Sequence, residues 1–296
     1  MTRAAAPRRL IVSADDFGMS PGVNAGIIRA HRDGILTDAS LMVNGGACAE
    51  AVALAHANPT LSVGLHLVLA QGFAVLPPAD IPLLVAPDGQ FGTNAIWNGM
   101  RYFFTPGVRA QLRREIRSQL DAFAATGLPL SHVDGHLTMH VHPTVLTILL
   151  EMADAYGIRA MRLPREPLRS ALRFSRQHLG RKVFEGTVFA ILSRYAAARM
   201  AGAGVRHPRR MFGMHQTGHV SEAYLLDVIG QLSPGTTELY CHAALDDDEA
   251  RRWRPPDYDG QGELASLTSA RVRAALDSAG VELTTYHELA GADRQR

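Results

Sequence analysis

Two adjacent carboxylates, Asp15 and Asp16, lie in the stretch S-A-D-D-F-G-M-S at 13–20, which directly follows the apolar residues 10–12. Neighbouring carboxylates at the end of a buried strand repel one another and lose hydration, so a fold that places them there needs a cation close by. Other residues able to bind a metal ion or to move a proton also follow apolar runs. They are His66, Asp134, His136 and His242. The sequence therefore predicts a polar site in which a metal ion is the cation.

Short apolar segments alternate along the chain with segments of helical periodicity. We expect strands at residues 10–14, 39–44, 62–67, 130–134, 159–163, 237–241 and 281–284. We expect helices at residues 23–32, 47–57, 108–126, 143–156, 221–232 and 266–278. Ser20 followed by Pro21 is a typical helix start. The repeated strand-then-helix units predict about seven parallel strands in one closed or nearly closed (β/α) barrel that spans residues 1–296.

The carboxyl ends of barrel strands are where active sites are assembled from several strands. The carboxylates and imidazoles named above all fall at such ends. One Asp with two His suits a borderline divalent cation such as zinc and leaves a coordination position for water or substrate. His132 and Asp134 share a strand face with His136, so either can orient a ligating imidazole, and His140 is a further candidate. A plainer alternative for the Asp pair is a helix cap beside a solvated neighbour.

The composition, 47% hydrophobic and 20% charged over 296 residues, is typical of a soluble globular chain with a large core. A secretory signal and a run of about 18 apolar residues are both absent from the sequence, so we expect a cytoplasmic protein. Cys48 and Cys241 are too few for a disulfide framework. No glycine-rich phosphate loop follows the first expected strand, and we expect no nucleic-acid partner. A monomer and a homodimer both remain open.

Four motifs in this order resemble the YdjC-like carbohydrate deacetylases: A-D-D-F-G at 14–18, V-G-L-H-L-V-L at 63–69, H-V-D-G-H-x-x-x-H at 132–140 and E-L-x-C-H at 238–242. The resemblance covers about residues 9–288. Residues 64–78, 127–136 and 161–167 are most similar to the hopanoid-biosynthesis-associated branch, HpnK. The resemblance implies a distorted (β/α) barrel and a divalent metal. It also implies removal of an N-acetyl group from N-acetylglucosamine carried on a bacteriohopane polyol lipid.

By matching position, the resemblance implies that Asp16, His66 and His136 bind one divalent metal ion, with zinc preferred and magnesium or another ion possible. It implies that Asp15 is the catalytic base. Amide hydrolysis also needs an acid for the departing amine, and we expect His242, as an imidazolium, to supply it. Much of the family has Pro-Gly after the late Cys-His, where this chain has Ala243 and Ala244, so the loop there is expected to differ in shape.

Arg162 and Glu166, after the fifth expected strand, are either substrate contacts or an ordinary surface ion pair. Rival functions also remain. A glycosidase normally needs two carboxylates on opposite sides of the scissile bond, and adjacent carboxylates are not so placed. A metal-dependent phosphoesterase would use a similar site. A deacetylase of soluble chitooligosaccharides and a non-catalytic barrel that binds sugar or lipid are also compatible with the sequence.

The segment 162–210 contains 12 Arg or Lys and 2 Glu, although the whole chain has a formal net charge of only +2. We expect a helical insertion at about 164–212 near the barrel mouth. Apolar residues at helical spacing are Leu168, Leu172, Leu179, Phe184, Val188, Ile191 and Tyr195, and a basic stripe is Arg169, Arg173 and Arg176. Such a pattern suits a lid that contacts an anionic membrane, at the inner face of the cytoplasmic membrane, or an ordinary packed insertion.

Overall fold

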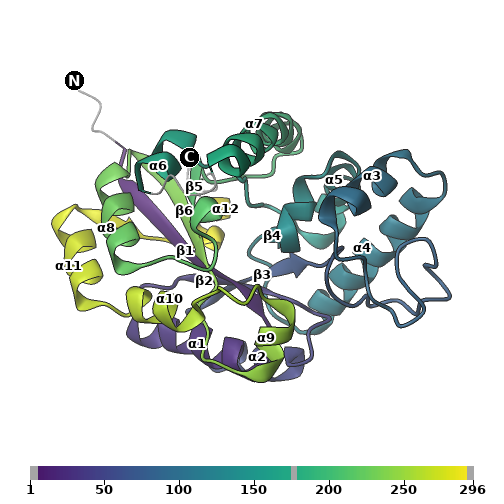
Figure 1. The fold of residues 1–296 in the computed structure, drawn as a ribbon, viewed down its shortest axis with the longest axis horizontal. Helices are drawn as coiled ribbons and strands as arrows, with labels where there is room; N and C mark the ends of the chain where they lie inside the picture. The colour runs from purple at the N-terminus through teal and green to yellow at the C-terminus, as the bar shows by residue number, and fades with distance from the viewer. Residues whose placement is uncertain (1–5, 175–178, 292–296) are drawn as a thin grey trace.

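A parallel sheet lies at the centre of the computed structural model, which describes residues 6–174 and 179–291 (Figure 1). Within these residues the sheet has seven strands in the order β4-β3-β2-β1-β6-β5, and β7 pairs with β1. The strands are β1 (Arg8–Phe17), β2 (Asp38–Leu41), β3 (Ser62–Leu67), β4 (Val133–Gly135), β5 (Arg210–Phe212), β6 (Gly235–Cys241) and β7 (Val281–Leu283). Strands β2 and β3 are buried along their whole length, as is typical of parallel sheets covered on both faces.

Helices surround the sheet, with α8 and α11 at one end of the molecule and α3, α4 and α5 at the other (Figure 1). The helices are α1 (Pro21–Asp33), α2 (Cys48–His56), α3 (Ala95–Phe104), α4 (Val108–Ala125), α5 (Pro143–Tyr156), α6 (Leu168–Phe174), α7 (Leu179–Gly202), α8 (Glu222–Gln231), α9 (Asp248–Trp253), α10 (Gly260–Leu267), α11 (Ala270–Ser278) and α12 (Tyr286–Gly291). The 3-10 segments are η1 (His136–Val141) and η2 (Met214–Gln216). The expected start of the first helix is confirmed, because the Ser20 hydroxyl accepts a hydrogen bond from the Val23 amide.

Irregular backbone pairing connects the two edges of the sheet. The amide of Val133 donates to the carbonyl of Ala160 at 3.1 Å, and the amide of Met161 donates to the carbonyl of Arg206 at 2.9 Å. Further along, the amide of Met211 on β5 donates to the carbonyl of Arg165 at 3.0 Å. The sheet is therefore curled into the distorted (β/α) barrel that the sequence predicts.

The expected regular strand at 159–163 is wrong, because Ala160 and Met161 form only isolated bridges there. Pro164 and Pro167 follow it, and a proline has no amide hydrogen with which to extend a ladder. The chain instead returns to the sheet at β5, a strand that the sequence pattern did not predict.

Two helical expectations also differ from the structure. The single helix expected at 266–278 is wrong, because α10 ends at Leu267 and α11 begins at Ala270. Ser269 caps the start of α11 by accepting hydrogen bonds from the Arg271 and Val272 amides. Helices α6 and α7 lie within the segment 164–212, before β5. Arg176 of the expected basic stripe and the side chain of Leu179 lie outside what the structure describes.

Candidate active site

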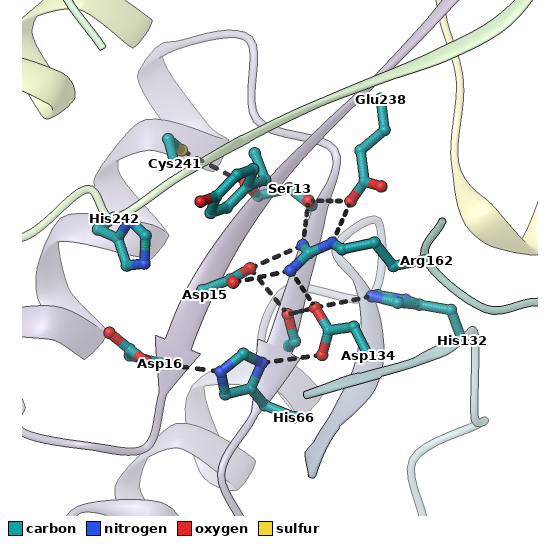
Figure 2. A network of polar contacts seen from close by, with 12 residues as sticks. Ser13, Asp15, Asp16, His66, His132, Asp134, Arg162, Glu238, Cys241 and His242 are labelled. Carbon is teal, nitrogen blue, oxygen red and sulfur yellow. Dashed lines mark hydrogen bonds and ion pairs between the residues drawn. The ribbon is translucent and has the colours of Figure 1, made fainter. Parts of the chain in front are cut away.

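The carboxyl ends of four parallel strands bring the predicted polar residues together (Figure 2). Asp15 and Asp16 lie at the end of β1, His66 lies near the end of β3, Asp134 lies on β4, and His242 directly follows β6. The register of β3 with β4 pairs His66 with Asp134. This convergence on one end of the sheet is the arrangement expected of an α/β barrel active site.

An irregularity in β1 turns both adjacent carboxylates into the site. Neighbouring side chains of a regular strand point to opposite faces of the sheet. Between Ala14 and Phe17 the pairing of β1 with β2 shifts in register, and Asp16 has a φ of 68°. A non-glycine residue in this left-handed region stores backbone strain, which proteins retain mainly at functional sites. The bulge therefore explains how Asp15 and Asp16 reach the same site (Figure 2).

Asp16, His66 and His136 form a cluster with the dimensions of a metal site. The Oδ1 atom of Asp16 lies 3.6 Å from His66 Nε2 and 3.4 Å from His136 Nδ1, and the two imidazole nitrogens are 3.4 Å apart. Donors about 2.0–2.2 Å from one tetrahedral ion lie about 3.3–3.6 Å from one another. Among the described residues, the buried Oδ1 of Asp16 has no hydrogen-bond partner. The three residues can therefore hold a divalent metal ion, and their mixed N and O donors do not determine which ion it is.

Asp134 orients the imidazole of His66 toward this cluster. The Nδ1 atom of His66 donates to Asp134 Oδ1 at 2.8 Å, which leaves Nε2 free to face Asp16. Burial would lower the pKa of His66, but the carboxylates of Asp134 and Asp15 outweigh it and raise that pKa to about 9. Ser40 donates to the other oxygen of Asp134 at 2.8 Å. In the neutral form that binds a metal ion, the imidazole of His66 is fixed by Asp134 in the tautomer that carries its proton on Nδ1. Orienting a ligating imidazole is one of the roles expected for Asp134.

Arg162 is the centre of a buried charge network beneath the cluster. Its Nη1 and Nη2 atoms each lie 2.7 Å from an oxygen of Asp15, in a bidentate ion pair. The same guanidinium lies 2.6 Å from Asp134 Oδ2 and donates through Nε to Glu238 at 2.9 Å. Only 4% of Arg162 is exposed, so the expectation of a surface ion pair is wrong. Arg162 reaches this place because its segment bridges β4, and it fixes the orientation of the Asp15 carboxylate.

Asp15 lies beside the cluster without belonging to the same donor set. One of its oxygens lies within 4.8 Å of a His66 ring nitrogen and of an Asp134 oxygen. Ser13 donates to Glu238 at 2.7 Å and accepts from Arg162 at 2.9 Å, and Tyr286 donates to the other oxygen of Glu238 at 2.6 Å. These contacts complete a network that holds Asp15 in place from behind (Figure 2).

Arg254 is a site residue that the sequence motifs missed. It follows α9, and its Nη2 and Nε atoms lie 3.0 and 3.3 Å from Asp16 Oδ2. Its Nη1 donates to the carbonyl of His242 at 3.1 Å. Burial alone would raise the pKa of Asp16, but His136 and Arg254 outweigh it and hold that pKa well below its ordinary value. No spacing signal marks Arg254, because 238 residues separate it from Asp16.

His242 faces the site from the end of β6. Its amide donates to the buried carboxylate of Glu263, and its ring lies 5.4 Å from the ring of Tyr240 and 5.3 Å from that of Tyr258. Burial lowers the pKa of His242 to about 4, even though Asp16 and Asp15 act in the opposite direction. The free protein therefore carries a neutral imidazole here at neutral pH, in contrast to the expected imidazolium. A role as acid requires His242 to take up a proton during the reaction.

The loop after His242 is shaped by close packing against α1. Ala243 and Ala244 are buried, and the amide of Ala244 donates to the carbonyl of Gly260 at 3.1 Å. A Cβ atom at Gly26 would lie only 2.4 Å from the Cα of Ala244, so the helix and the loop fit together only because residue 26 is glycine. This packing positions the segment that follows the late Cys-His pair.

Three predicted residues remain: His132, His140 and Glu166. His132 and His140 lie behind the site: His132 stacks on Tyr286 with ring centroids 4.0 Å apart, and His140 Nε2 lies 3.1 Å from the carbonyl of Arg162. Burial lowers the pKa of His132 to about 3 and that of His140 to about 4, so both are neutral. The hydrogen bonds described for Glu166 connect it to other elements, because it accepts from the Tyr224 hydroxyl and the His215 amide, both at 3.0 Å.

Comparison with known proteins identifies one family for this chain. The family model described as YdjC-like protein matches residues 9–278. A carbohydrate deacetylase of Geobacillus stearothermophilus is 33% identical over 95% of this chain and 98% of its own length. One of Brevibacillus brevis is 45% identical, but the match covers 51% of this chain and 57% of that protein.

A crystal structure from Enterococcus faecalis V583, of a protein provisionally described as a cellobiose-phosphate cleavage protein, has a TM-score of 0.74 at 26% identity. It covers 96% of this chain and 99% of the other. The fold and the site define an α/β barrel with an Asp-His-His cluster. The chain belongs to the YdjC-like protein family.

Proposed function

We propose that this protein is a metal-dependent carbohydrate deacetylase that hydrolyses the N-acetyl group of an amino sugar. The observation that carries the proposal is the Asp16, His66 and His136 cluster with Asp15 held beside it by Arg162. Membership of the YdjC-like family and the name carbohydrate deacetylase borne by its curated relatives support the reaction class.

Different residues of the site carry out the different steps of amide hydrolysis. A divalent ion held by the cluster would polarise the amide carbonyl and acidify a water molecule. Asp15 accepts the proton as that water adds to the carbonyl carbon, because Arg162 keeps its carboxylate in one orientation. The C–N bond then breaks, acetate leaves, and the amine nitrogen takes up a proton. His242, on the opposite side of the site, takes up a proton from solvent and delivers it to the nitrogen, and Asp15 releases to solvent the proton that it accepted.

We extend the proposal to the substrate that the sequence resemblance implies, N-acetylglucosamine carried on a bacteriohopane polyol lipid. Soluble chitooligosaccharides are the alternative substrates. The apolar stripe expected in the basic segment supports a lipid, because Phe184, Val188, Ile191 and Tyr195 of α7 are all exposed, Phe184 by 63% and Ile191 by 65%. Apolar side chains that gather on a surface are typical of contact with lipid or with another protein.

Contact with an anionic membrane through residues 164–212 belongs to the same proposal. Arg194 and Arg199 are exposed arginines of α7, the helix that carries the apolar stripe. An anionic leaflet attracts each nearby arginine by about 1 kcal/mol. Within the described residues, no helix combines the length and the apolarity needed to span a bilayer. The proposed contact is therefore peripheral.

Acetate release tests the proposal directly. Protein purified without chelator should release acetate from an N-acetylglucosaminyl lipid or from chitooligosaccharides. Dialysis against a chelator should abolish the release, and added zinc or magnesium should restore it. The substitution Asp277→Asn, at an exposed position of α11, is the matched control and should change neither metal content nor rate. Turnover that persists in metal-free protein would refute metal dependence, and no acetate from either substrate class would refute the reaction.

A further inference from the structure

A small cavity opens among the loops that follow β1, β2 and β3, next to the proposed metal cluster. Its volume is about 140 Å³, and its apolar wall consists of Met19, Met42, Val68, Phe73 and Trp253. Three of the wall residues, Met19, Val68 and Trp253, adjoin residues of the site. The Met19 amide donates to the Asp16 carbonyl at 2.9 Å, and Val68 lies two residues after His66. Trp253 directly precedes Arg254, which forms the ion pair with Asp16.

The amide side chains of the cavity hold its walls together. Gln71 donates through Nε2 to the carbonyl of Trp253 at 2.7 Å, and Asn44 donates through Nδ2 to the carbonyl of Phe73. The rings of Phe73 and Trp253 meet edge to face, with centroids 5.6 Å apart. Each side-chain amide nitrogen thus donates to a backbone carbonyl of the wall, whereas the buried Oδ1 of Asn44 has no hydrogen-bond partner among the described residues. Glu249, an exposed residue of α9, is the charged side chain of the lining.

These contacts favour an apolar occupant. A hydroxyl-rich sugar ring would lose hydration against the five apolar side chains, and Asn44 Oδ1 and the Glu249 carboxylate can pair with only some of its hydroxyl groups, which costs free energy. An alkyl group gains from leaving water and asks for no hydrogen bonds. Ligand pockets of whole drug-sized molecules measure about 300–1,000 Å³, so this cavity takes only one part of a larger ligand.

Backbone strain gives a second, independent observation. In residues 6–174 and 179–291, the non-glycine residues with positive φ are Asp16, Gln71, Leu137 and Thr138. Asp16 belongs to the metal cluster, and Leu137 and Thr138 directly follow His136. Gln71, with a φ of 48°, neither belongs to the metal cluster nor directly follows one of its residues. Strain that a fold retains points to a functional constraint. The side chain of Gln71 donates to the carbonyl of Trp253, so this strained residue is connected to the cavity wall.

We propose that this cavity is a subsite for an apolar group attached to the reacting amino sugar, and that Phe73 and Trp253 select substrates that carry one. The proposal rests on the deacetylase function proposed above. It predicts that the enzyme prefers an aliphatic aglycone to a second sugar ring. The cavity accepts the portion of that aglycone nearest to the sugar, and the rest of it remains outside.

A series of alkyl N-acetylglucosaminides tests the preference. From methyl through butyl to octyl, kcat/KM of the wild-type protein should rise about fourfold for each methylene that enters the cavity and then level off. The substitution Phe73→Ala should flatten this rise. Phe104→Ala, on α3 and 72% exposed, is the matched control and should keep the wild-type series. A flat wild-type series, or a larger gain from the second ring of diacetylchitobiose than from octyl, would overturn the proposal.

A binding measurement separates this subsite from the deacetylase reaction. The chain has two tryptophans, so Trp97→Phe leaves Trp253 as the fluorescent reporter. Octyl glucoside, which has no acetyl group, should shift the emission to the blue in a saturable titration below its micelle concentration. Phe73→Ala should weaken that binding by about tenfold or more. Emission that responds to cellobiose and not to octyl glucoside would refute the apolar subsite, whether or not the protein releases acetate.

Discussion

Two regions of the protein contrast with each other. The floor of the candidate site, formed by Arg162 and the carboxylates around it, buries charged groups, whereas the outer face of α7 exposes apolar side chains. Beneath the cluster, Arg162 is buried among the carboxylates of Asp15, Asp134 and Glu238. On α7, a stripe that includes Phe184 and Ile191 is exposed. Buried charges are costly even when paired, and gathered apolar side chains on a surface cost solubility. Both regions depart from what stability alone favours, and both fit the roles proposed for them: catalysis for the buried network and lipid contact for α7.

The two adjacent carboxylates, Asp15 and Asp16, also differ in their surroundings. Both oxygens of Asp15 are engaged with one guanidinium, whereas Oδ1 of Asp16 faces two imidazoles and has no hydrogen bond within the described structure. Asp15 is held in position, and Asp16 keeps a donor atom for a ligand. Their different surroundings therefore assign the two carboxylates to different roles, and substitution of each should have a different effect.

The largest effect is expected from Asp16→Asn. Asparagine tolerates the left-handed backbone at this position, so the fold should be retained. The amide lacks the charge that a divalent ion requires, and the protein should lose both its bound metal and its turnover. Metal analysis and acetate release on the same preparation measure the two losses. If the variant kept a full equivalent of metal, Asp16 would not be a ligand.

The substitution Asp15→Asn should separate metal binding from catalysis. We expect the metal content to stay at the wild-type level, because Asp15 is not among the proposed ligands. Turnover should fall by about 10² to 10⁴, the range typical of a missing general base. Near-normal turnover would mean that another group takes the proton. Asp134 and His140 are the next candidates, although Asp134 is already engaged with His66 and Arg162.

Removal of the guanidinium tests whether the floor depends on charge pairing. Arg162→Met would leave three buried carboxylates without their shared cation. Breaking a buried pair in this way typically costs about 3–5 kcal/mol in the free energy of unfolding. Urea denaturation near pH 7 measures the loss, and Arg101→Met, an arginine of α3, serves as the control. A loss below about 1 kcal/mol would show that the network is not needed for stability.

Local sequence signals predicted much of this fold and site. Apolar runs followed by Asp or His placed β1, β3, β4 and β6 and the residues at their ends, because a strand end is a short-range feature. The irregular pairing of residues 159–165 was not visible in the same way. Whether Ala160 and Met161 form a strand or isolated bridges depends on partners far along the chain, such as Val133 and Arg206.

Long-range partners explain why the roles of Glu238 and Arg254 were missed. Glu238 looks like one polar residue in an apolar strand, and only the folded sheet places it against Ser13 and Arg162. Arg254 carries no motif and reaches Asp16 across most of the chain. Helix α3 was also missed, although its sequence is amphipathic: Asn98 and Tyr102 are buried, and Trp97 and Phe104 are exposed.

The substitution Glu166→Gln should change the pH dependence of stability. Burial raises the pKa of Glu166 from 4.5 to about 7, against hydrogen bonds from the His215 amide and Tyr224. Between about pH 4.5 and 7 the folded protein keeps this proton while the unfolded chain releases it, so wild-type stability falls as pH rises through that window. The variant lacks this contribution, which is at most about 3 kcal/mol.

Chemical denaturation of both proteins at several pH values measures the difference. The free energy of unfolding of wild type, relative to Glu166→Gln, should decline from pH 4.5 to pH 7 and stay constant above pH 8. Parallel curves for the two proteins would show that Glu166 has an ordinary pKa. Turnover and KM of the variant test the expected substrate contact of Glu166, which a changed KM would support.

The smallest effect concerns the apolar and basic face of α7. We expect the wild-type protein to sediment with vesicles that contain phosphatidylserine at low salt, and to do so less with pure phosphatidylcholine. Arg194→Gln with Arg199→Gln removes about 2 kcal/mol of attraction, or roughly thirtyfold in binding. Arg252→Gln, an exposed arginine of α9, is the matched control and should bind as wild type does.

Substitution of the apolar stripe tells a membrane contact from simple charge attraction. Phe184→Ser with Ile191→Ser keeps every arginine, so vesicle binding by charge alone would survive it. An interfacial helix instead loses the free energy of burying both side chains in the bilayer surface. Weaker binding by this variant and by the arginine variant together would place α7 at the membrane. Binding equal to wild type in both variants would make the segment an ordinary packed insertion, and the contrast between floor and helix would then concern the site alone.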